Sequence, residues 1–134
     1  MLSLITDNLD LWAEGLLNTV QLTVMGFVIA FFVAIPIALA RLSDNRLLSG
    51  AAYGYIYFVR GTPLLVQIFL IYYGLGQFNG TLRDLGLWWF FRDAFNCGLT
   101  AFVINSAAYQ AEILRGGILA VPKGVIEGGR ALGL

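Results

Sequence analysis

A long stretch without a single charged residue runs from Gly15 to Ala40. Folded as an α-helix, this stretch would be about 39 Å long, which exceeds the roughly 30 Å thickness of the hydrocarbon core of a bilayer. We therefore predict a first transmembrane helix over residues 15–40. Pro36 falls near the far end of this helix, where a membrane-spanning helix tolerates proline as a kink.

The composition of the whole chain also indicates a membrane protein. Hydrophobic residues make up 59% of the sequence and charged residues 12%, whereas about a quarter of the residues of a soluble domain are charged. The net charge is zero, so the chain lacks the basic surface that nucleic-acid binding requires. There is no His, and Cys97 is the only Cys, which argues against a disulfide framework and against a metal site. We expect an all-α integral membrane fold without a metal.

The remaining apolar sequence predicts two further spans. Residues 63–75 alone would reach only about 20 Å, so the second span must begin near residue 53 and include Arg60. Arg60 then either extends to the headgroups, forms an ion pair or takes part in transport. The Gly61-Thr62-Pro63 sequence should bend this helix. The third span is predicted over 94–115, after an interfacial loop over 76–93.

The distribution of basic residues predicts the orientation of these three spans. Cytoplasmic segments of membrane proteins are enriched in Lys and Arg, which places the N-terminus outside and the C-terminus in the cytoplasm. Residues 1–14 would then form an amphipathic segment on the outer side, or a frayed terminus. The expected cytoplasmic group is Arg41, Arg46, Arg60, Arg115, Lys123 and Arg130, against Arg83 and Arg92 outside.

The third predicted span has one face of small and polar residues. Small residues at such spacing usually pack against other helices, and polar ones need protein or water neighbours inside a membrane. Gln67, Asn105 and Tyr109 are therefore candidates for lining a hydrophilic substrate path. Near the cytoplasmic end of the span, Glu112 and Arg115 are three residues apart, which predicts an ion pair. The face consists of Gly98, Ala101, Asn105, Ala108 and Glu112.

Residues 116–134 predict a short helix after the third span. Gly116 and Gly117 should end the preceding helix, and Pro122 can open a new one. Its glycines each disfavour a helix by about 1 kcal/mol relative to Ala, so the helix would need a partner to hold it. The residues concerned are Val125, Ile126 and Leu132 on the apolar side and Gly128, Gly129 and Gly133 among the glycines.

Four stretches resemble the type-1 membrane permeases of binding-protein-dependent ABC importers, in the polar amino-acid branch. GLLNTVQLTV at 15–24 and ARLS at 40–43 are weak matches, whereas VRGTPLLVQIFLIYYGL at 59–75 is similar to a strong signature of the branch. The second strong one is AYQAEILRGGILAVPKGVIEGGRALGL at 108–134. Its EGGRALG resembles the family's cytoplasmic coupling motif, Glu-Ala-Ala-x-x-x-Gly. The resemblance covers nearly the whole chain from Gly15.

The resemblance implies an importer permease in the bacterial cytoplasmic membrane, with residues 15–134 forming part of a transmembrane domain. Its partners would be a cytoplasmic ATPase dimer, a second permease chain, identical or different, and an extracytoplasmic binding protein. ATP would be bound by the ATPase, so the chain itself would have no cofactor and no enzymatic activity. Family spans beyond the motif are absent, which predicts the N-terminal part of a permease. The expected coupling residues are Val125, Ile126, Glu127, Gly128, Gly129, Leu132 and Gly133.

A small three-span membrane protein that acts as an assembly or regulatory subunit, without transport of its own, is the alternative. Its support is the chain length, since three spans enclose a polar path with difficulty. An enzyme is less favoured, because Lys123, the only Lys, has no phosphate-binding glycine loop around it and no Ser or Thr after it. The sequence does not identify the substrate, and amino acids or opines fit the branch.

Overall fold

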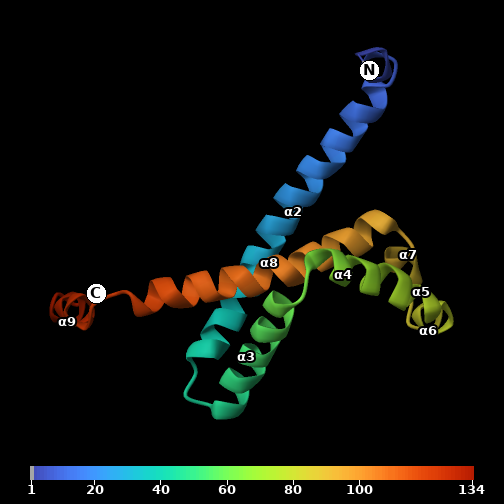
Figure 1. The fold of residues 1–134 in the computed structure, drawn as a ribbon. Helices are drawn as coiled ribbons and strands as arrows, with labels where there is room; N and C mark the ends of the chain where they lie inside the picture. The colour runs from blue at the N-terminus through green and yellow to red at the C-terminus, as the bar shows by residue number, and fades with distance from the viewer. Residues whose placement is uncertain (1) are drawn as a thin grey trace.

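The computed structural model describes residues 2–134, and every element in this range is helical (Figure 1). Two long helices, α2 and α8, cross near the middle of the molecule, and α3 runs back beside α2 after a short turn. The elements are α1 (Leu2–Thr6), α2 (Leu9–Leu42), α3 (Arg46–Gly61), α4 (Leu64–Phe69), the π-helix η1 (Leu70–Gly74), α5 (Leu75–Gln77), α6 (Asn79–Asp84), α7 (Trp88–Phe91), α8 (Ala94–Leu119) and α9 (Lys123–Ala131).

Helix α2 contains the whole predicted first span and is the one continuous helix in the described range that is long and apolar enough to cross a membrane. It passes through Pro36 without a break. Residues 1–14 were predicted as a segment separate from the first span. Helix α2 already begins at Leu9, so residues 9–14 belong to the same helix as the span. Asn45 then caps α3, its side chain accepting hydrogen bonds from the backbone N–H groups of Leu47 and Leu48.

The predicted bend in the second span is confirmed, and it is large. The axis turns by 103° between α3 and the helical segment from Leu64 to Gln77. Pro63 explains the break, because proline lacks an N–H and forces the preceding residue out of the helical conformation. Thr62 accordingly has an extended backbone, with φ −113° and ψ 142°. The segment over 53–75 is therefore a broken helix, which forms either a span in two parts or a re-entrant loop.

Two other expectations about local structure were wrong. The predicted loop over 76–93 is largely helical, because α6 and α7 lie within it. Gly116 and Gly117 do not end α8, which continues to Leu119. A glycine inside a helix costs only about 1 kcal/mol, so a long helix can pass through two of them. The helix ends instead just before Pro122, which lacks the N–H that a continuing helix needs.

The core is built from small residues where α2 crosses α8. Gly26, Ala30, Ala34 and Ala38 recur every fourth residue along α2, and all four are buried. On α8 four alanines are completely buried, of which Ala101 and Ala108 belong to the predicted small face, whereas Ala107 and Ala111 lie beside it. Small residues let two helix backbones approach closely, which drives helix association in membranes. The buried alanines of α8 are Ala101, Ala107, Ala108 and Ala111.

Replacing one of these alanines should weaken the crossing. Ala34 has no exposed surface, so Ala34→Leu would push α2 and α8 apart and should cost about 1–3 kcal/mol. Thermal unfolding in detergent, followed by far-UV circular dichroism, measures this loss. Ala13→Leu makes the same change at an exposed position of the same helix and should have little effect. Equal melting temperatures for the two variants would show that the crossing is not tightly packed.

Candidate functional site

Gln67 holds the break between α3 and α4 together. Its side-chain amide donates hydrogen bonds to the carbonyl oxygens of Val59 (2.9 Å) and Thr62 (3.2 Å) and to the Thr62 hydroxyl (2.8 Å). Val59 lies in the last turn of α3 and Thr62 directly follows the helix, and the Val59 carbonyl also accepts a hydrogen bond from the backbone N–H of Thr62, at 3.4 Å. The amide oxygen of Gln67 in turn accepts a hydrogen bond from Asn105 on α8, at 3.3 Å.

Two of the three predicted pathway residues are therefore brought together. Gln67 and Asn105 form one hydrogen bond between the broken helix and α8. The amide nitrogen of Gln67 is already bonded to groups at the end of α3. Tyr109 lies one turn further along α8, is 43% exposed, and belongs to a different surface. The role of all three residues in a substrate path stays a prediction.

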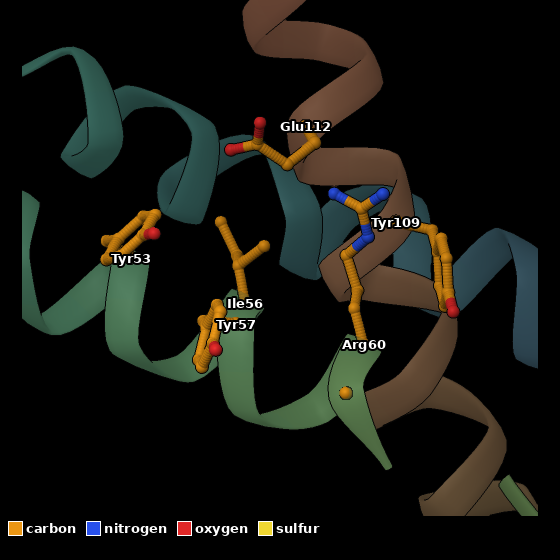
Figure 2. Close-up of a pocket in the computed structure, with 7 residues that line it drawn as sticks. Tyr53, Ile56, Tyr57, Arg60, Tyr109 and Glu112 are labelled. Atoms are coloured by element: carbon orange, nitrogen blue, oxygen red, sulfur yellow. The ribbon is translucent and has the colours of Figure 1, made fainter. Parts of the chain in front are cut away.

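Tyr109 lines a cavity between α3 and α8 that we call the arginine pocket (Figure 2). Its volume is about 430 Å³. Arg60 extends from the end of α3 toward α8, on the side where Tyr109 and Glu112 project. The guanidinium carbon of Arg60 lies 5.0 Å from the centre of the Tyr109 ring, in a cation–π contact. The lining residues are Tyr53, Ile56, Tyr57, Arg60, Gly61, Tyr109 and Glu112.

The predicted ion pair between Glu112 and Arg115 is confirmed. Arg115 Nε donates to both carboxylate oxygens of Glu112, at 3.1 and 3.3 Å, and Nη2 donates to Oε2 at 3.0 Å. The sequence did not predict that Arg41, at the end of α2, also lies 3.7 Å from this carboxylate. Between residues 2 and 134 these are the two ion pairs, so Arg60 has no carboxylate partner of its own there.

Gln110 is a further polar residue that the sequence analysis missed. It is 8% exposed, and its amide donates to the carbonyl oxygen of Phe27 on α2, at 3.2 Å, and to the Ser106 hydroxyl, at 3.0 Å. The one sequence signal for such a role was that Gln110 is a polar residue on the face of α8 that packs against α2. Gln110 therefore fastens the helix crossing by a hydrogen bond as well as by packing.

The closing segment forms the predicted helix after Pro122. Figure 1 shows α9 at the end of α8, apart from the other helices. Val125, Ile126 and Glu127 are exposed on it, and Leu132 and Gly133 follow its end. Gly133 has φ +79°, and the N–H groups of Gly133 and Leu134 donate to the carbonyl oxygens of Arg130 and Gly129.

These two bonds and the left-handed glycine make a Schellman motif, which stops a helix at a defined residue. Left-handed backbone is strained for residues other than glycine, which gives Gly133 a structural reason to be glycine. The coupling role of the segment stays a prediction.

Comparisons with known proteins agree with this geometry. The chain is 51% identical over 117 residues to the nopaline transport system permease protein NocM of Agrobacterium fabrum, which covers 87% of the chain and 48% of NocM. It is 46% identical over 134 residues to the octopine transport system permease protein OccM of Rhizobium meliloti, covering 96% of the chain and 54% of OccM. The chain thus spans about half the length of these relatives.

A solved structure and a family model give the same assignment. The structure, a crystal structure of an amino acid ABC transporter with histidines, matches with a TM-score of 0.77 and 38% identity, over 97% of this chain and 56% of the other. The family model matches residues 26–134. Because that match covers most of the sequence, the chain belongs to the family of binding-protein-dependent transport system inner membrane components.

Proposed function

We propose that this chain is part of the permease subunit of an ATP-driven importer of amino acids or opines in the bacterial cytoplasmic membrane. The names of the relatives support this cargo, since they are permeases for nopaline, octopine and arginine. The family description supports a binding protein outside and a location in the inner membrane. The alternative of a regulatory subunit without transport is less favoured, because these relatives are named as permeases.

The observation that carries the proposal is the exposed helix α9. Its nine residues leave Val125 63% and Ile126 46% exposed, and Glu127 is exposed between the two ends of the helix. A helix this short has little stability of its own in water. Contact with a partner would supply the missing burial, and an ATPase on the cytoplasmic side is the partner that the coupling motif implies.

The proposed topology has the N-terminus outside and three crossings, made by α2, the broken helix from α3 to α5, and α8. Of these, α8 carries several polar residues: Asn96, Asn105, Gln110 and Glu112. Polar groups in a span need protein or water around them, so α8 would face other helices of a permease pair. The second permease chain, the ATPase dimer that binds ATP, and the binding protein complete the proposed assembly, and no nucleic acid takes part.

A chimera tests the proposal. Residues 1–134 would replace the matching half of NocM, and the chimera would be expressed with the ATPase, the binding protein and the other membrane subunits of that importer. We expect ATP-dependent uptake of nopaline into membrane vesicles. The matched control lacks the binding protein and should show no uptake. A chimera that inserts and binds the ATPase, yet takes up no nopaline in either case, would contradict a permease function.

A further inference from the structure

We propose that the arginine pocket binds the phosphate group of an anionic phospholipid, with Arg60 as its ligand. This site goes beyond transport, because its ligand belongs to the membrane and is not carried across it. Its place in the cytoplasmic leaflet rests on the proposed topology, in which the end of α2 faces the cytoplasm.

Basic groups outnumber acidic ones around the pocket. The carboxylate of Glu112 accepts hydrogen bonds of 3.0 to 3.3 Å from Arg115 and lies 3.7 Å from Arg41. Arg60 lies over the Tyr109 ring and pairs with no carboxylate in the part of the chain that the structure describes. Three guanidinium groups therefore gather around one carboxylate, and the group without an anionic partner is that of Arg60.

The other two arginines of this cluster already have partners. The guanidinium carbon of Arg41 lies 4.7 Å from the centre of the Tyr53 ring, and its Nη1 donates to the Ser49 hydroxyl at 3.4 Å. Arg115 is bound to Glu112 on its own helix. Arg60, by contrast, is exposed, and its side chain extends from the end of α3 toward α8 (Figure 2). Arg60 is therefore the group of the cluster that is placed to bind a ligand.

The pocket lies at the level of the lipid headgroups. Arg41 directly follows the charge-free run of the first span, and it pairs with Glu112, which lines the pocket. This ion pair ties the pocket to the end of the span, where hydrocarbon gives way to headgroups. Tyrosine is enriched at this level of membrane proteins, and Tyr53, Tyr57 and Tyr109 all line the pocket.

The chemistry of the pocket favours an anionic phospholipid over other membrane lipids. A guanidinium offers two parallel N–H donors that match two oxygens of a phosphate. The excess of positive charge favours a headgroup with a net negative charge over a zwitterionic one, and basic pockets between transmembrane helices on the cytoplasmic side bind anionic headgroups. Beside the pocket, Tyr57 is 72% and Phe58 69% exposed, which leaves an apolar surface for acyl chains.

The experiment counts the lipids that stay bound to the whole chain. The chain is reconstituted in nanodiscs of phosphatidylcholine with a minority of phosphatidylglycerol, extracted in mild detergent and analysed by native mass spectrometry. We expect one phosphatidylglycerol per chain, enriched at least tenfold over its share of the nanodisc. Arg60→Gln should reduce this enrichment at least tenfold, and Arg60→Lys, which keeps the charge without the planar pair of donors, should lie between.

A matched control separates a site from diffuse surface charge. Arg46→Gln removes the same charge from an exposed position of α3, about 21 Å along the helix from Arg60, and should leave the enrichment unchanged. Circular dichroism confirms that each variant is folded. Lipid retention is measured without transport, so it is independent of nopaline uptake by the chimera. A chimera that fails to transport would contradict the permease function and leave the lipid site intact.

Four results would overturn the inference. Equal retention of the two lipids would show that the pocket does not select an anionic headgroup. Unchanged enrichment in Arg60→Gln would place the lipid elsewhere, and an equal loss in Arg46→Gln would reduce the effect to general surface charge. Release of the bound lipid by soluble glycerol phosphate, at a concentration equal to that of phosphatidylglycerol, would show a site for free phosphate compounds and not for a membrane lipid.

Discussion

Gly133→Leu should abolish coupling between the ATPase and transport while the membrane part stays folded. Gly133 has φ +79°, where a leucine side chain collides with its own backbone at a cost of about 1–2 kcal/mol. The change would also disturb the two hydrogen bonds that end α9. In the chimera, we expect at least a tenfold loss of ATPase co-purification and of nopaline uptake. Glu127→Lys should act similarly by reversing a charge on the exposed docking surface.

Matched variants separate docking from general damage. Gly80→Leu adds the same side chain at a glycine with open space and no left-handed backbone, and Glu14→Lys reverses a charge near the other terminus. Both should leave coupling intact. Topology is tested in each variant with Ser3→Cys and Gly124→Cys, in a Cys97→Ala background. A thiol reagent should reach the cysteine at position 3 from outside the membrane and the cysteine at position 124 from the cytoplasm. Labelling of Ser3 from the cytoplasm alone would refute the topology and, with it, the coupling role.

Two alanines provide a change in the opposite direction. Gly128 and Gly129 both have open space where a Cβ would go, so Gly128→Ala with Gly129→Ala should fit without a clash. Removing two glycines from a helix lowers its cost by up to about 2 kcal/mol. Coupling in this double variant should be unchanged or stronger. Normal assembly in both Gly133→Leu and Glu127→Lys would mean that α9 is only a surface segment.

The first span and the small face of α8 were predictable because each depends on local sequence. A charge-free run from Gly15 to Ala40 is long enough to cross a bilayer as a helix, and it lies within α2. Alanines on one face of α8 pack against another helix because small residues allow close contact. The bend at Pro63 and the start of α9 after Pro122 follow from the missing N–H of proline.

The contacts between distant segments were not predictable in this way. Arg41 and Glu112 meet because α2 and α8 cross, and nothing in either local sequence encodes that angle. The same applies to Arg60 over Tyr109 and to Gln67 beside Asn105. The prediction that Gly116 and Gly117 end the third helix was wrong for a different reason. Two glycines disfavour the helical conformation by only about 2 kcal/mol, and the 26-residue helix α8 continues through them.

Gln67→Leu should destabilise the chain strongly. The amide of Gln67 serves three acceptors at the end of α3 and one donor on α8. Leucine fills a similar volume but removes the donor to the Thr62 carbonyl and the acceptor for the Asn105 amide, and each unpaired buried group costs about 1–3 kcal/mol. We expect a loss of about 3 kcal/mol or more in unfolding free energy, measured by chemical denaturation in detergent.

The cost arises at the break, so it should appear as movement there as well as lower stability. Without Gln67, the Thr62 carbonyl loses its side-chain donor, Val59 keeps only its bonds from Thr62, and α4 loses its contact with Asn105, which frees the 103° bend to change. Spin labels at exposed Phe58 and Leu65, on either side of Pro63, should report a broader distance distribution in Gln67→Leu. Gln21→Leu makes the same substitution at an exposed position of α2 and should alter neither quantity. Asn105→Leu removes only one of the four contacts, so its loss of stability should lie between those of Gln21→Leu and Gln67→Leu. If Asn105→Leu lost as much stability as Gln67→Leu, the contact with α8 would be the main support of the break, and the bonds to the end of α3 would not.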